Sequence, residues 1–360
     1  VLIAQLRQGF EQAMRQQQGE DASRELAETS IQQLETVVKE ADELAFGINI
    51  DQSQQLIGID FSFTALPGTQ LAAGYGGQQA IPSLFSSVIR DDAAAFVHSA
   101  TSISPEAIDQ AKTSIESSMG MLRGAIADQG GMPPEQVREF QTYLDRLTDI
   151  IIESLAEGKS DTGAIVLAGS NQFQFALGTF VGDGTKVADL AKDLAKKVPD
   201  ATDAPKFKID IGKISGVTMH LVEGDVPESE DEVRAVFGEK IQVHIGTAPK
   251  AIYLAGGRGS KELLQNLITS GKADNVGDRP LSQFKMRLLP FMQLAQSVET
   301  NDVIEAMVGA LAGSTDKGAM TVVGKTVPNG SSGRMTIGEG LLKAIGAAVS
   351  AAQQQRQHAF

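Results

Sequence analysis

The sequence contains no cysteine among its 360 residues. Disulfides, thiolate nucleophiles and cysteine-based zinc or iron–sulfur sites are therefore excluded. Long apolar runs are missing as well, because the nearest stretch, 341–352, contains Lys343, Gly346 and Ser350 and is shorter than the ~20 residues of a membrane-spanning helix. Basic residues are few: 31 Lys and Arg stand against 45 Asp and Glu, giving a net charge of −14. This charge disfavours nucleic acid and anionic lipid headgroups as partners.

The remaining composition is typical of a folded globular protein, with 42% hydrophobic and 21% charged residues and a mean hydropathy of −0.08. A single core stops growing near ~250–300 residues, so a chain of this length is expected to form two domains. We place the boundary at Gly158-Lys159-Ser160, where a helical pattern ends. The prediction is a first domain over 1–158, a second over 159–352, and a flexible Gln-rich tail over 353–360.

The first domain is expected to combine helices with a β-hairpin. Apolar residues at near-helical spacing predict an amphipathic helix within residues 1–42. From residue 57 to residue 65 apolar and polar residues alternate, which predicts an antiparallel strand whose hairpin partner is 44–50. Ser104-Pro105-Glu106 and Pro133-Pro134-Glu135 then announce two long helices, which we expect to pack as an αα-hairpin.

The second domain carries a repeated pattern of two short β-type runs and a helix. The copies cover 164–197, 241–268 and 319–349, and their first strands begin 77 and 78 residues apart. Further strands are predicted at 208–213, 217–222 and 284–289, with a short helix near 230–237. The fold class is therefore α+β: an antiparallel sheet of six to eight strands, built from hairpin–helix units, with its helices on one face.

Glycine-rich loops offer the first candidate sites. Gly257 and Arg258 lie in a Gly-Gly-Arg-Gly-Ser turn ahead of a predicted helix, whose free N–H groups could bind an anion. A flexible strand-to-helix turn is the favoured interpretation, because the equivalent loop at 182–185 carries Asp183 where the other carries arginine. The string 318–326 ends in Gly-Lys-Thr but has five residues between its glycines and a turn behind it, so it is a hairpin and not a phosphate-binding loop.

Histidines offer a second, weaker possibility. His220 and His244 are expected on the polar faces of two strands, and if these strands were neighbours the two rings could bind a metal or sense pH. A third ligand with suitable spacing is missing from the sequence, so solvent-facing histidines are the favoured interpretation. His98 lies in a small, apolar run and is expected to be half-buried and hydrogen-bonded. No serine lies in Gly-x-Ser-x-Gly, no catalytic residue can be named, and no cofactor is predicted.

Two passages carry a resemblance to a wider group of proteins. The run 237–245, followed by 251–257 and a helix, and the strand 57–65 with the Leu-Pro-Gly segment behind it, resemble passages in uncharacterised exported bacterial proteins. The similarity covers about half of the chain. It implies a periplasmic or secreted location and no particular activity. The chain starts at Val1 rather than methionine, so we expect that an upstream segment, which could include an export signal, is missing.

These observations favour a non-enzymatic binding or scaffolding protein outside the cytoplasm, whose partner is a protein or an apolar small molecule. A second hypothesis is a carrier of a lipid or other apolar ligand, with Phe61, Phe63, Phe173 and Phe175 lining a cavity formed by the sheet. A third is an enzyme of unknown type, with a pocket that joins His220, His244 and a carboxylate.

Overall fold

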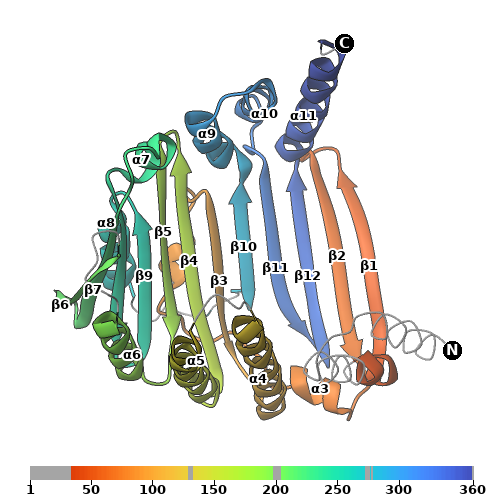
Figure 1. The fold of residues 1–360 in the computed structure, drawn as a ribbon. Helices are drawn as coiled ribbons and strands as arrows, with labels where there is room; N and C mark the ends of the chain where they lie inside the picture. Colours follow the sequence, from red (N-terminus) through yellow and green to blue (C-terminus); the bar gives the residue numbers. More distant parts are fainter. Residues whose placement is uncertain (1–33, 129–132, 198–203, 272–275, 277–278, 359–360) are drawn as a thin grey trace.

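The protein is built around one antiparallel sheet of twelve strands (Figure 1). The computed structural model describes residues 34–128, 133–197, 204–271, 276 and 279–358. The strand order is β1-β2-β12-β11-β10-β3-β4-β5-β9-β8-β7-β6. The α+β class and the antiparallel sheet are therefore confirmed, but the expected size of six to eight strands is wrong. Periodicity reveals where a strand lies and not which distant strand it will hydrogen-bond to.

The bounds of the strands, in chain order, are as follows. They are β1 Ala41–Asp51, β2 Leu56–Ala65, β3 Ala95–Ser102, β4 Lys159–Gly169, β5 Gln172–Phe180, β6 Lys206–Ile214, β7 Val217–Asp225, β8 Lys240–Ala248, β9 Ala251–Gly257, β10 Ser282–Arg287, β11 Ala319–Val327 and β12 Gly330–Gly338.

The helices connect these strands or follow them. They are α3 Gln70–Tyr75, the 3₁₀ helix η1 Ser86–Val88, α4 Pro105–Asp128, α5 Pro134–Leu155, α6 Gly184–Lys197, α7 Asp231–Phe237, α8 Ser260–Thr269, α9 Leu288–Val298, α10 Asp302–Ala312 and α11 Glu339–His358. Residues 34–40 are also helical and lead directly into β1. The rest of the predicted N-terminal helix lies outside the described residues.

Strands from both sides of residue 158 are hydrogen-bonded neighbours. β3 pairs with β4 from Ala95/Val166 to Ser102/Lys159, and β2 pairs with β12 over nine residue pairs. The hairpin β1–β2 has the predicted pairing of 44–50 with 57–63. The division into two domains at residue 158 stays a prediction, and one continuous sheet spans both segments.

Alternation along each strand gives the sheet two chemically distinct faces. Directly paired residues share a face, so the registers can be followed from β2 to β7. One such row, on what we call the front face, is Ile59, Met335, Val322, Phe284, Val97, Ala164, Leu177, Leu254, Ile245 and His220. The adjacent row, on the back face, is Asp60, Arg334, Val323, Gln283, His98, Gly163, Gly178, Tyr253, Gly246 and Met219.

Helices pack on both faces, so the prediction that they gather on one face is wrong. On the front face, Phe237 of α7 packs edge-to-face against Phe173, and Tyr75 of α3 lies 5.8 Å from Phe63. Figure 1 shows α3, α4, α5 and α6 near one end of the strands and α7, α9, α10 and α11 near the other. On the back face, α8 buries four apolar residues from successive turns of one side of the helix, Leu263, Leu264, Leu267 and Ile268.

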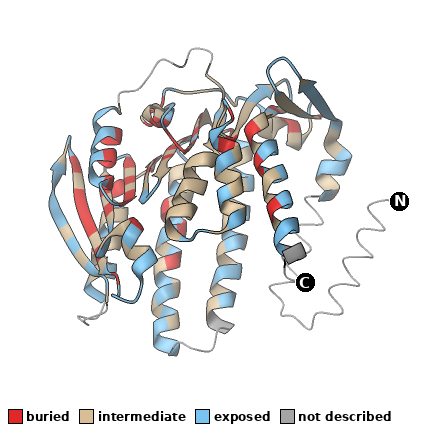
Figure 2. Cartoon of the chain, turned by 90° about the horizontal axis from the view of Figure 1, so that it is seen from above, coloured by how far each residue is buried: buried red, intermediate tan, exposed pale blue. Residues whose placement is uncertain are grey.

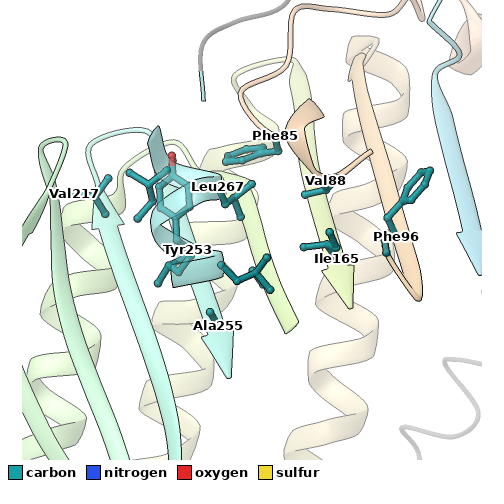
Figure 3. Packing of buried hydrophobic residues seen from close by; sticks show 14 of the residues in the cluster. Phe85, Val88, Phe96, Ile165, Val217, Tyr253, Ala255 and Leu267 are labelled. Carbon is teal, nitrogen blue, oxygen red and sulfur yellow. The ribbon is translucent and has the colours of Figure 1, made fainter. Parts of the chain in front are cut away.

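The hydrophobic core lies between α8, η1 and the back face of β4, β5 and β9 (Figure 3). Phe85 is fully buried there and meets Tyr253 edge-to-face, with ring centroids 5.7 Å apart. Gly163 and Gly178 are directly paired across β4 and β5 and leave the space that the Phe85 ring occupies. The core therefore lies against the part of the sheet from β3 to β7, and β1 and β2 are at the opposite margin.

The C-terminal segment differs from its prediction. α11 continues to His358, so residues 353–358, predicted as a flexible tail, belong to a helix. Gln, which makes up four of these six residues, has good helix propensity. The Gln355 amide also donates a hydrogen bond to Asp302 of α10, with a distance of 3.3 Å.

Candidate functional site

The most unusual surface of the molecule is the front face of the hairpin β1–β2. Leu44, Phe46, Ile48 and Ile50 lie on one side of β1 and are 79%, 69%, 66% and 66% exposed. Their direct partners on β2 are Phe63, Phe61, Ile59 and Ile57. Eight large apolar side chains thus cover one face of a hairpin at the sheet margin. We call this set of eight residues the apolar hairpin face. Figure 2 shows exposed residues along the helices and at the sheet margins, so this face is distinguished by its apolar character and not by exposure alone.

The apolar character continues beyond the hairpin. Next to Ile57 and Ile59 the register places Ile337 and Met335 of β12, and then Met320 and Val322 of β11. Each of these four side chains is partly exposed. Apolar patches on a monomer rarely exceed a few hundred Å² without a functional reason, so this surface is the leading candidate for binding.

Helix α9 adds to the apolar surface. Its sequence, LLPFMQLAQSV, is mostly apolar, and yet none of its residues, all of which are described, is fully buried. The helix that follows, α10, buries only Leu311. Apolar helices in a globular protein normally bury at least one full stripe, so these two helices present hydrophobic side chains that the described chain leaves partly uncovered.

The back face of the same strands is polar. Arg334 of β12 makes two parallel hydrogen bonds to Asp60 of β2, with Nε to Oδ1 at 2.6 Å and Nη2 to Oδ2 at 2.9 Å. The guanidinium holds the pKa of Asp60 below its ordinary value. The two side chains border an open hollow of about 620 Å³ that Lys325 and Ser332 also line. The hairpin is therefore amphipathic, with an ion pair and polar side chains on one face and exposed apolar side chains on the other.

The four phenylalanines of the carrier hypothesis lie on the front face but do not converge. Phe61 and Phe63 are on β2, whereas Phe173 and Phe175 are on β5, six strands away in the sheet. At about 4.8 Å per strand the two pairs are roughly 29 Å apart. Phe173 instead contacts Phe175 and α7. The prediction of one cavity lined by all four residues is wrong, because sequence alternation fixes the face of a side chain and not the position of its strand.

The loop that contains Gly257 and Arg258 is explained by backbone geometry. Gly257 has φ = 101°, and a Cβ there would lie 2.9 Å from Gln174 Cα and would overlap the Phe173 carbonyl. Gly259, also with positive φ, precedes α8. Arg258 is exposed, and its guanidinium lies over Gly238 at the end of α7. The glycines thus allow a close turn between β9 and α8, which is the interpretation that the sequence favoured.

The two candidate histidines lie on neighbouring strands but on opposite faces. In the β7–β8 register His220 pairs with Ile245, and His244 pairs with Leu221, so the imidazole rings cannot meet. Both residues are buried, and the prediction that they face solvent is wrong. Among the described residues no group of three His, Cys, Asp or Glu side chains could hold a metal ion.

His220 has a structural role near the β6 edge. Its Nδ1 accepts a hydrogen bond from the Asp210 backbone N–H at 3.1 Å, and its Nε2 lies 3.1 Å from the Thr247 hydroxyl. Nδ1 is therefore unprotonated and the ring is neutral. Burial lowers the pKa of His220, an effect that the nearby Asp210 carboxylate opposes. Burial likewise lowers the pKa of His244.

A serine, a histidine and an aspartate do come together, although no sequence motif predicts this cluster. Ser83 Oγ donates to Asp161 Oδ1 at 2.6 Å, and His98 Nε2 lies 2.9 Å from Ser83 Oγ. In a catalytic triad the serine hydroxyl donates its hydrogen bond to the histidine, whereas here it donates to the aspartate carboxylate. All three side chains are buried, so a substrate could not reach them. The network attaches the 83–85 loop to β3 and β4, and His98 is more deeply buried than predicted.

Comparisons with known proteins found no match, so the candidate site is judged from its geometry. No protein-family model, no curated protein and no solved structure matches the chain. Among the described helices none is both long enough and apolar enough to cross a membrane.

Proposed function

We propose that this chain is a non-enzymatic binding or scaffolding protein that acts outside the cytoplasm, and that the apolar hairpin face is its binding surface. The observation that carries the proposal is the exposure of Leu44, Phe46, Ile48 and Ile50 on one side of an edge strand. Transfer of such side chains out of water contributes about 1.5–3 kcal/mol for each when complete. A partner that covers this face therefore gains from the burial of several large apolar side chains at once.

The partner class favoured by the geometry is another protein with an apolar surface. The apolar hairpin face is open and lies at the sheet margin, which suits an extended contact better than enclosure of a small molecule. Its polar reverse side, with the Asp60–Arg334 ion pair, would stay in water when the front is covered. This arrangement resembles the apolar centre and polar rim of a protein interface.

A carrier of a lipid or other apolar ligand is the second candidate. It is favoured by α9 and α10, whose apolar side chains are only partly covered, and by the adjoining front face of β10 and β11. A ligand in this region would be held by Phe284, Val322 and Met286 rather than by the four phenylalanines named from the sequence.

An apolar fluorescent dye tests the main proposal. We expect the dilute protein to bind the dye and the Phe46→Lys/Ile48→Lys variant to lose most of the signal, because two charges would interrupt the apolar hairpin face. Ile211→Lys is the matched control, since Ile211 is a half-exposed isoleucine on the opposite edge strand, β6. Equal dye binding by the wild type and the double variant would contradict the proposal.

Native mass spectrometry after mild extraction separates the two candidates. A protein that shows only its own mass supports the protein-binding role. A protein that retains a lipid-sized adduct, lost after substitution of Phe284 or Val322 by Lys, supports the carrier.

We also infer that the segments β4–β5–α6, β8–β9–α8 and β11–β12–α11 are copies of one duplicated hairpin–helix unit, and that α4 and α5 form an αα-hairpin. The nearly equal spacing of the copies supports the first inference, and the Arg123–Asp145 ion pair between α4 and α5 supports the second. The copies share the hairpin and differ in the face on which the helix packs, with α8 on the back. Separate expression of 159–352 would test both the duplicated unit and the predicted domain boundary.

A further inference from the structure

The two edges of the sheet are chemically different. β6 is the edge at one end; it carries Lys206, Lys208 and Lys213, and its register shifts between Lys208 and Gly212. Lysines and β-bulges are the usual means by which an edge strand avoids pairing with another chain. The β6 edge is therefore protected against further strand addition.

The other edge, β1, has little of this protection. The segment 44–50 reads LAFGINI, with no charged residue and no proline. Its only register irregularity lies at its start, between Ala41 and Glu43. Within the part of the chain that the structure describes, no strand pairs with the outer side of β1. Such an edge is suited to pair with another strand.

The sequence of β1 is complementary to itself. If a second β1 runs antiparallel to the first and the two are related by a two-fold axis at Gly47, Leu44 lies opposite Ile50 and Phe46 opposite Ile48. Ala45 then lies opposite Asn49 on the other face. Directly opposed residues share a face, so all four apolar side chains of each copy meet apolar side chains of the other.

We propose that two copies of this chain associate through antiparallel pairing of their β1 strands about Gly47. The inference rests on the proposed function, because the pairing joins the two apolar hairpin faces into one continuous surface for the partner. A two-fold axis perpendicular to the sheet keeps both front faces on the same side. The occupant of the β1 edge is thus a second copy, and the front face stays free to bind.

The size of β1 sets the strength of this contact. A stable interface uses about 20–30 residues from each partner, whereas β1 has 11 residues. The dimer is therefore weak and reversible, with dissociation expected in the micromolar range. The register also places Glu43 opposite Asp51 of the second copy at both ends, and like charges in direct opposition are unfavourable. Added salt should consequently strengthen the dimer.

A disulfide tests the register directly, since the chain has no cysteine of its own. Gly47 would lie opposite itself, with Cα atoms about 4.5–5.5 Å apart, within the range of a disulfide. A Cβ at Gly47 would lie 3.8 Å from the nearest atom, Asp60 Cβ, so Gly47→Cys fits. Asn49→Cys is the matched control, because two copies of residue 49 would be roughly 14 Å apart and could not be linked.

We expect Gly47→Cys to form a disulfide-linked dimer under mild oxidation and Asn49→Cys to remain unlinked. Light scattering of the wild-type protein should show a dimer fraction that increases with concentration and with salt. Equal linking of both variants, or a wild-type protein that stays monomeric up to about 100 µM, would overturn the inference. Slow amide exchange of β1 in such a monomer would mean that another segment of the chain covers the edge. This result would also overturn the inference.

The result for the dimer is separable from the result for the proposed function. A monomer that still binds the apolar dye, and loses it in Phe46→Lys/Ile48→Lys, would overturn the dimer and support the binding role. A dimer whose dye binding is unaffected by that double variant would support the pairing of β1 and contradict the binding role. Circular dichroism of each variant confirms that the fold is retained.

Discussion

Replacement of Gly178 by alanine should be among the most destabilising single-methyl additions in this protein. A Cβ at Gly178 would lie 2.5 Å from Phe85 Cε1, closer than real Cβ contacts occur. The ring cannot move away, because Phe85 is fully buried and its other side is close to Gly163. A Cβ built on Gly163 would lie only 2.7 Å from Phe85 Cβ. Overpacking of a core costs about 1–3 kcal/mol, and this confined site should lie at the upper end.

Urea unfolding followed by circular dichroism measures the effect as a shift of the midpoint with an unchanged slope. Gly169→Ala is the control, since Gly169 is also at a strand position of the β4–β5 hairpin and a Cβ there meets nothing within 4 Å. That variant should stay within about 0.5 kcal/mol of the wild type. In the Gly178→Ala background Phe85→Ala should cost less than it does alone, because the two residues compete for one space. A Gly178→Ala protein as stable as the wild type, or additive costs, would refute this account of the core.

Three further predictions concern stability. Burial lowers the pKa of His220 from its ordinary value of 6.5, so the unfolded chain binds the proton more readily. The free energy of unfolding should therefore decrease as pH falls below about 6.5. His220→Gln should reduce this dependence of the unfolding free energy on pH, measured by urea titrations at several pH values. An unchanged slope would mean that the Asp210 carboxylate offsets the effect of burial, so that His220 has the same pKa in the folded and unfolded chain. Leu264→Ala, which empties a fully buried site under α8, should cost about 2–5 kcal/mol in thermal or urea unfolding, whereas Leu342→Ala at an exposed site should cost under 1 kcal/mol. Ser83→Ala removes a donor from a buried carboxylate and should cost about 1–3 kcal/mol, and a neutral effect would show that the buried network contributes nothing.

The local structure of the hairpins could be read from the sequence because it depends on neighbouring residues. The alternation of Ile57, Ile59, Phe61 and Phe63 with small or polar residues predicts both the strand β2 and its apolar face. Proline and acidic residues predict the starts of α4 and α5. These signals are short in range, and each is stabilised by contacts within a few residues.

The candidate site was only partly predictable. Phe61 and Phe63 do belong to the apolar hairpin face, but the larger exposure of Phe46 and its neighbours depends on β1 being an edge strand, which the sequence does not reveal. Likewise, alternation could not show that His220 and His244 have opposite orientations, because a one-residue difference in register reverses the face.

By itself the sequence determined the absence of cysteine-based chemistry, the fold class and the amphipathic pattern of its strands. Composition is a property of the whole chain and periodicity is a property of short segments. Both can therefore be read without knowing which distant residues are in contact. The tertiary structure alone decided the order of the twelve strands, the burial of Ser83, His98 and Asp161, and the exposure of β1. These features depend on which strands that are distant in sequence become neighbours, and that choice is made by the free energy of the whole sheet and its core.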